Sequence, residues 1–179
     1  MRLLSICMVL LLTTVKVLSA QTSTPLTTSP NLSAIAFLTK HEWEAQLPDA
    51  PDGKKREIHA KFTWSQNGQA IRISNQFLTD GQPRPYLDGL YTWDPQRRAI
   101  VFWYVDAEGT LTKGEVKTKD GKLIHEFEQV TSDGKSTAYV AKVTPHAEEA
   151  WDNEIFERRG TELKAIVNVR YEGAEKANK

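Results

Sequence analysis

Residues 85–109, PYLDGLYTWDPQRRAIVFWYVDAEG, decide the fold of this 179-residue chain. Asp94-Pro95 interrupts the stretch, because proline fixes φ and donates no backbone hydrogen bond. The segments on both sides are rich in aromatic and β-branched residues, which favour strands, so the stretch predicts two strands joined by a tight turn. Residues 99–105 are apolar at successive positions, which predicts a strand covered on both faces.

The rest of the chain repeats this pattern of short strands and tight turns. Residues 57–64 alternate, with Ile58, Ala60 and Phe62 on one face. Turn pairs such as Asn67-Gly68 tolerate positive φ and predict hairpins. The strands expected after the first, which begins at Trp43, are 57–64, 69–78, 84–93, 98–105, 110–118, 122–130, 135–144, 151–158 and 162–171.

About ten strands in consecutive hairpins predict an all-β fold. Neighbours joined by such short turns run antiparallel in a meander, and closing the sheet removes its two exposed edges. We therefore predict an up-and-down antiparallel β-barrel of about 8–10 strands, with a short N-terminal helix covering one end. A two-sheet β-sandwich is the alternative.

The two ends of the chain differ in composition from its middle. Residues 1–20 combine Arg2, a short apolar run and a small residue at Ala20, which predicts a signal peptide and an exported protein, periplasmic or secreted. An uncleaved membrane anchor is the alternative; after cleavage no membrane span is expected. Cys7, the single cysteine, would leave with this segment, so cysteine-based metal sites are not expected.

Three further segments complete the expected organisation. Residues 21–31 form a flexible Thr/Ser/Pro linker, residues 32–172 the barrel domain, and residues 173–179 a polar tail. The formal net charge is zero, which argues against a nucleic-acid partner because such proteins carry a basic excess. The sequence leaves the oligomeric state open.

Several segments resemble a known family. Phe37, Leu38 and Trp43 before the first strand are similar to the start of calycin barrels, with His41 in the position of a glycine. Residues 67–73, 88–93 and 101–109 resemble bacterial exported lipocalin-like barrels of unknown function, and the resemblance covers residues 35–172.

Nitrobindin-like barrels are more distant relatives in this interpretation. They hold haem through a histidine near the C-terminal end, whereas no histidine follows His146 here. Haem binding therefore does not carry over from the resemblance, and we expect no cofactor.

The sequence nominates six candidate ligand-binding residues. Asp88 lies between Tyr86 and Leu90 on one face of its predicted strand, and a buried carboxylate there would need a cation such as Arg72 or Arg170. A rim position or a structural ion pair is the alternative. The six candidates are Arg72, Tyr86, Asp88, Trp103, His125 and Arg170.

His125 and Trp103 are nominated for different reasons. His125 shares a face with Leu123 and Phe127, so it is expected to point into the barrel, either as a ligand-contacting group or as a hydrogen-bonded core histidine. Trp103 lies on a strand, where an aromatic side chain forms core or the wall of an apolar pocket.

Three functional hypotheses remain open. The favoured one is a binding module that holds a small apolar or amphipathic molecule inside the barrel. The second is an enzyme that uses Asp88, His125 and an arginine at the barrel mouth, although the chain contains no nucleophile elbow, no HExxH motif and no phosphate loop. We nominate no catalytic residue and no metal ligand. The third is a filled barrel that acts as an interaction protein.

Overall fold

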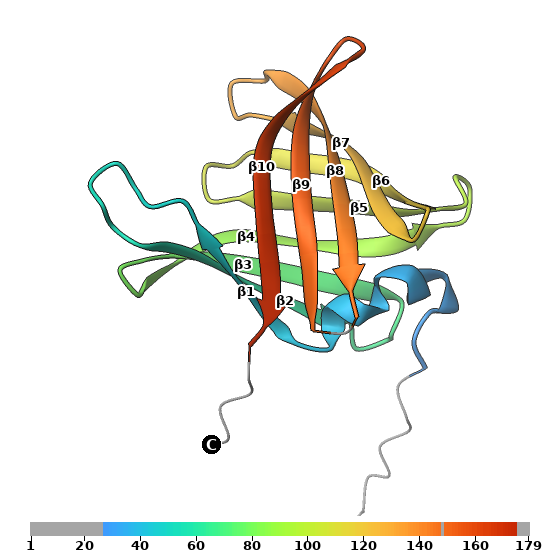
Figure 1. The fold of residues 1–179 in the computed structure, drawn as a ribbon. Coiled ribbons are helices and arrows are strands. Elements are labelled where there is room, and N and C mark those ends of the chain that lie inside the picture. Colours follow the sequence, from blue (N-terminus) through green and yellow to red (C-terminus); the bar gives the residue numbers. More distant parts are fainter. Residues whose placement is uncertain (1–26, 148, 175–179) are drawn as a thin grey trace, which may run out of the picture.

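The computed structural model describes residues 27–147 and 149–174 and contains a closed antiparallel barrel of ten strands (Figure 1). Each strand pairs with the next along the chain, and β1 pairs with β10 to close the sheet. The strands are β1 Glu42–Leu47, β2 Arg56–Trp64, β3 Ala70–Thr79, β4 Gln82–Asp94, β5 Ala99–Asp106, β6 Leu111–Lys119, β7 Lys122–Val130, β8 Ser136–His146, β9 Ala150–Arg159 and β10 Glu162–Gly173. The predicted fold class is confirmed. The predicted signal peptide, residues 1–20, lies outside the described residues.

Two of the hairpin turns have the backbone conformation that their Asp-Gly sequences predict. Asp80-Gly81 and Asp120-Gly121 each separate their strands by two residues, and all four have positive φ. A turn of this type needs positive φ at both central positions, which Asp and Gly tolerate. These turns join neighbouring strands tightly enough to set their register.

One prediction about β5 is wrong. Ile100 and Phe102 are buried on its inner face, but Trp103 and Val105 on the outer face are 44% and 45% exposed. The wall of a barrel is a single layer, so only its inner face is covered. An apolar outer face gives the same continuous run in the sequence as a strand buried on both sides.

Two inward-facing glycines allow neighbouring strands to approach closely. A Cβ atom on Gly114 would lie 2.3 Å from the carbonyl oxygen of Glu126, and one on Gly89 would lie 2.2 Å from Tyr104 Cβ. Glycine within a strand often marks such a close backbone approach. These positions let the sheet coil tightly where β4, β5, β6 and β7 form the wall.

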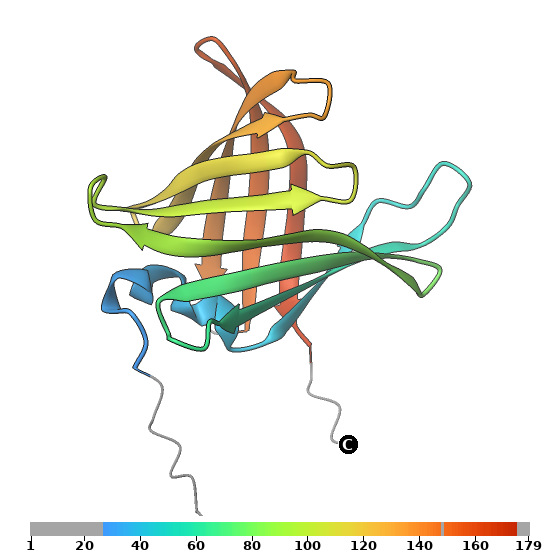
Figure 2. The same ribbon diagram turned by 180° about the vertical axis from the view of Figure 1, so that it is seen from behind.

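A 3-10 helix, η1 (Pro30–Thr39), covers one end of the barrel, as expected (Figure 2). It buries Leu32, Ile35 and Leu38 against the core. Trp43 at the start of β1 is also fully buried, and its indole Nε1 donates a hydrogen bond to the Leu38 carbonyl, 2.7 Å away. The helix and the first strand thus form one packed plug.

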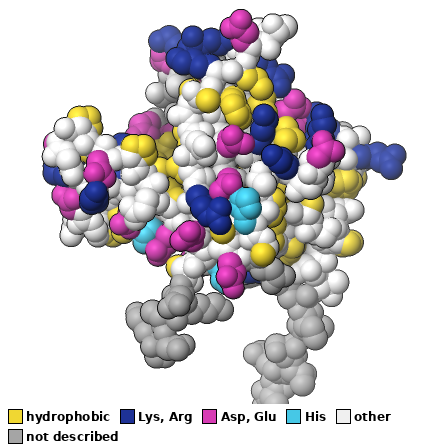
Figure 3. Space-filling view, viewed as in Figure 1, with side chains coloured by type: hydrophobic (Ala, Val, Ile, Leu, Met, Phe, Trp, Pro, Cys, Tyr) yellow, Lys and Arg dark blue, Asp and Glu magenta, His cyan; other side chains and the backbone are white. Residues whose placement is uncertain are grey.

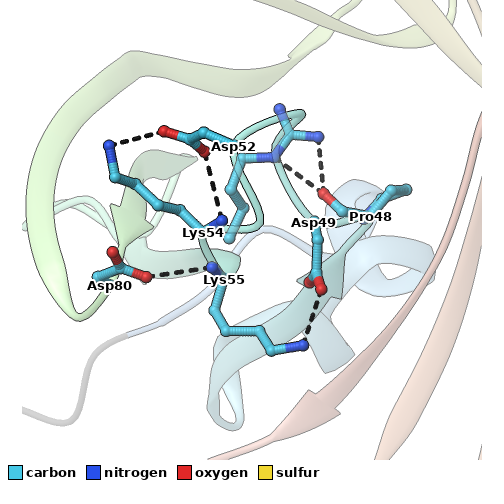
Figure 4. A network of polar contacts seen from close by, with 7 residues as sticks. Pro48, Asp49, Asp52, Lys54, Lys55 and Asp80 are labelled. Carbon is cyan, nitrogen blue, oxygen red and sulfur yellow. Dashed lines mark hydrogen bonds and ion pairs between the residues drawn. The ribbon is translucent and has the colours of Figure 1, made fainter.

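The opposite end carries the long β1–β2 loop, which is braced against the β3–β4 turn (Figure 4). The Lys55 backbone N–H donates to Asp80 Oδ1 over 3.1 Å, and the Asp80 N–H donates to the Lys55 carbonyl over 3.0 Å. Within the loop, Lys55 Nζ contacts Asp49 at 2.8 Å, and Arg56 donates twice to the Pro48 carbonyl. The two hairpins therefore hold each other in place at this end.

The plug can be tested with a pair of tryptophan substitutions. Trp43→Phe removes the indole donor and leaves the buried Leu38 carbonyl unpaired, so we expect it to lower the free energy of unfolding by about 2 kcal/mol. Trp103→Phe, on the exposed outer face, should change it by less than about 0.5 kcal/mol. Urea denaturation of both variants measures this, and equal losses would contradict the assigned role of Trp43.

Candidate functional site

The barrel encloses a cavity of about 400 Å³. A cavity of this volume is within the range of small-molecule sites. Its wall is mostly aliphatic and aromatic, and it extends from Leu38 of η1 to Leu47, Phe77 and Ile166 towards the other end. The remaining lining residues are Ile58, Ala60, Phe62, Ile73, Asn75, Tyr86, Leu87, Tyr91, Phe102, Tyr104, His125, Phe127, Gln129, Tyr139, Ala141, Val143, Trp151, Asn153, Ile155, Val167, Val169 and Tyr171.

The cavity and the outer surface differ sharply in charge. None of the described residues that line the cavity is Asp, Glu, Lys or Arg. The side of the barrel that Figure 3 shows carries charged side chains of both signs, intermingled on its outer surface. The interior is therefore a neutral, largely apolar compartment with a few polar groups.

Four buried side-chain atoms lack a hydrogen-bond partner in the described part of the chain. They are Asn75 Oδ1, His125 Nδ1, Trp151 Nε1 and Asn153 Oδ1. All four residues line the cavity. Buried polar atoms in folded proteins nearly always have a partner, and leaving one unpaired costs about 1–3 kcal/mol. All four therefore border one compartment, where a group inside the cavity could pair with them.

His125 is the most deeply buried of the histidines. It lies on β7 beside Ala141 of β8, and its ring packs edge-on against Phe102 and Tyr91 with centroid distances of 5.4 and 6.0 Å. Burial disfavours the charged imidazolium and lowers the pKa of His125 to about 4. The ring is therefore neutral at pH 7, with one nitrogen able to donate a hydrogen bond and the other able to accept one.

Three buried tyrosines of the cavity, Tyr91, Tyr104 and Tyr171, also stay uncharged at pH 7. Burial raises the pKa of Tyr104 to about 12, although a hydrogen bond with Thr112 acts in the opposite direction. Burial raises the pKa values of Tyr91 and Tyr171 as well. These hydroxyls remain protonated at pH 7 and can both donate and accept hydrogen bonds.

Two of the six sequence-nominated residues line the cavity, Tyr86 and His125. The other four, Arg72, Asp88, Trp103 and Arg170, are exposed on the outer face. The structure therefore does not bring the six together. The carboxylate and the arginines that the enzyme hypothesis required are separated from His125 by the wall of the barrel.

A β-bulge explains why Tyr86 and Asp88 do not share a face. The β3–β4 register shifts between Asn75 and Gln76, so that Tyr86 has no partner on β3. Tyr86 packs against Phe77 with ring centroids 4.3 Å apart, whereas Asp88 pairs in register with Ser74 and is exposed. A bulge inserts one residue and so inverts the alternation on one side of it.

Arg170 has other partners than Asp88. Its guanidinium lies 3.5 Å from Asp152 and 3.6 Å from Glu172, and Asp152 also contacts His146 at 2.5 Å. The side chains of this cluster are 34–74% exposed, and ion pairs in contact with water contribute little to stability. We therefore assign it to the outer surface of β8, β9 and β10.

Sequence reasoning missed three of the four cavity residues that carry unpartnered buried atoms: Asn75, Trp151 and Asn153. A signal for two of them was present, because Asn75 alternates with Ile73 and Phe77, and Asn153 alternates with Trp151 and Ile155. An amide on an otherwise apolar strand face needs a buried partner. Trp151 gave no such signal, because a tryptophan on an inner face is ordinary core.

A second hollow of about 630 Å³ lies on the outer face of β5, β6, β7 and β8. It is larger than the interior cavity, but its charged side chains pair with one another. Arg158 contacts Glu126 at 3.0 Å, and Lys113 contacts Glu128 at 3.6 Å. None of the unpartnered buried atoms in the described residues belongs to it. The interior is therefore the stronger candidate site.

Residues 27–147 and 149–174 contain neither a metal-binding cluster nor a membrane-spanning helix. No group of three or more His, Cys, Asp or Glu side chains there could hold a metal ion. None of the helices in this part of the chain has the length and apolarity needed to cross a membrane.

Comparisons with known proteins place the fold. No family model and no curated protein sequence matches the chain. Among solved structures, the chain is similar to the crystal structure of Rv2717c from M. tuberculosis, with a TM-score of 0.55 and 11% identity over 83% of this chain and 100% of that one. At this identity the likeness shows the fold alone, a ten-stranded antiparallel barrel. The lipocalin-like relationship stays a prediction.

The burial of His125 predicts a specific pH dependence of stability. The pKa of His125 is about 4 in the folded chain and about 6.5 in the unfolded chain. Between these two pH values the unfolded state binds more protons, so the free energy of unfolding decreases as the pH is lowered. From about pH 7 to about pH 5 this group alone should cost about 2 kcal/mol. Between pH 7 and pH 5 the free energy of unfolding of His125→Gln, measured by urea denaturation, should therefore decrease by about 2 kcal/mol less than that of the unaltered chain. An identical pH dependence in both proteins would contradict the buried neutral histidine.

Proposed function

We propose that this chain is an exported small-molecule-binding β-barrel that holds an apolar or amphipathic ligand in its interior. One observation carries the proposal: a cavity of about 400 Å³ to which all four unpartnered buried polar atoms of the described residues belong. A neutral pocket with few polar groups suits ligands that are mostly apolar.

The two other hypotheses are less well supported. A filled barrel requires large side chains that occupy the interior, whereas Ala60 and Ala141 are among the residues around the cavity. An enzyme at the barrel mouth requires Asp88 close to His125, and these two lie on opposite faces of the wall. Export rests on the sequence of residues 1–20 and is part of the proposal.

The proposal predicts that filling the cavity blocks binding. Ala141 lies on the inner face of β8 and lines the interior, whereas Ala138 on the same strand is exposed and lines the outer hollow. We expect Ala141→Leu to weaken the binding of the neutral fluorescent probe N-phenyl-1-naphthylamine by at least about tenfold, which corresponds to about 1.4 kcal/mol. Ala138→Leu should bind it as the unaltered chain does.

Fluorescence titration of the three proteins measures this, with circular dichroism to confirm that each is folded. If Ala138→Leu alone weakened binding, the ligand would occupy the outer hollow and the interior site would be wrong. If the unaltered chain did not bind the probe at all, the proposed function would lose its support.

A further inference from the structure

The interior has enough chemical detail to define the class of its ligand. We propose that the barrel selects an amphiphile whose polar end is uncharged, such as an alcohol, ketone or amide, and that Trp151, Asn153 and His125 hold this end. The inference rests on the proposed function, because it names the ligand of the same cavity.

Trp151 and Asn153 lie together on the inner face of β9. They are two residues apart on β9, so both side chains face inward. The Trp151 indole is fixed by Tyr171, on which it stacks at a centroid distance of 4.0 Å and an angle of 6°, and by Trp43 at 6.1 Å. Its Nε1–H is buried and unpartnered. An indole can only donate, so its partner must present an acceptor.

His125 lies two strands away from this pair, with β8 between them. His125 of β7 lies opposite Ala141 of β8, and Ala141 lies opposite Ile155, the inward neighbour of Asn153 on β9. Ala141, with its short side chain, is therefore the cross-strand neighbour of His125 and a diagonal neighbour of Asn153, two residues that both carry unpartnered atoms. A small polar group beside Ala141 could reach both, and Asn and neutral His can each accept or donate.

The described lining residues include no Asp, Glu, Lys or Arg that could neutralise a charged ligand. Burying an unpaired carboxylate or ammonium group costs far more than burying a hydroxyl that finds a hydrogen bond. His125 cannot serve as a cation at pH 7, because burial lowers its pKa to about 4. An arginine can pair with a carboxylate through two parallel hydrogen bonds, but Arg72 and Arg170 lie on the outer face here.

The charges that act on the cavity near Tyr86 add to this selectivity against anions. The pKa of Tyr86 is raised by burial and, in addition, by the negative charges of Asp106 and Glu108. A carboxylate that approached Tyr86 would meet the same negative field. An uncharged polar end meets no such repulsion.

Ligands of one chain length with three different ends test the inference. Decan-1-ol, decanoate and decylammonium each have about eleven or twelve heavy atoms, which suits a cavity of about thirteen water-sized volumes at ~30 Å³ each. We expect decan-1-ol to displace N-phenyl-1-naphthylamine from the intact chain at pH 7 with an affinity at least about tenfold higher than that of either ion.

A matched pair of asparagine variants assigns the polar end. Asn153 faces the cavity, and Asn168 of β10 is exposed on the outer surface. Asn153→Leu should lower the affinity for decan-1-ol by at least about fivefold, whereas the naphthylamine probe, which apolar contacts hold, should still bind. Asn168→Leu should leave the affinity for both molecules unchanged.

The outcomes separate the inference from the proposed function. If decanoate or decylammonium bound as tightly as decan-1-ol, or if decan-1-ol failed to displace a bound probe, the inference would be wrong while the proposed function stood. Equal effects of Asn153→Leu and Asn168→Leu would overturn the assignment of the polar end. If neither the probe nor decan-1-ol bound, both proposals would fail.

Discussion

Closure of the sheet between β1 and β10 is the constraint on which the rest of the structure depends. The seam is short, with Trp43 opposite Gly173 and Glu44 opposite Glu172, and the Ala174 N–H donates to the Glu42 carbonyl at 2.8 Å. It satisfies the backbone groups of two strands that would otherwise be open edges. It also encloses the inner faces of all ten strands, so that every inward side chain borders one compartment.

The interior compartment contains neutral polar side chains but no charged ones among its described lining residues. Charged groups remain on the outer face, where they pair with one another or with water, and the interior keeps only neutral polar groups. At one end of the barrel, η1 and Trp43 close the cavity. At the other end the cavity is lined by Leu47, Phe77 and Ile166, near the β1–β2 loop and the β3–β4 turn, which are hydrogen-bonded to each other. The same closure that stabilises the sheet therefore creates a neutral site with unmet hydrogen bonds.

The sequence was sufficient for the fold because its local signals agree. Turn pairs such as Asp80-Gly81 set hairpins at short spacing, and alternation in β2 identified its inner face correctly. The candidate site was harder, because each face assignment depends on register. The bulge near Asn75 moved Tyr86 away from the face of Asp88. The partners of a buried amide such as Asn153 also depend on which strands meet across the barrel, and spacing along the chain does not contain that information.

The central claim is that the interior of this barrel holds a small uncharged molecule. Native mass spectrometry of the intact chain, purified gently from the cells that make it and compared with Ala141→Leu, tests it most directly. We predict a reproducible extra mass on the unaltered chain that disappears on denaturation and is missing from the variant. The mass of the bare chain in both proteins, or the same extra mass on both, would contradict the account.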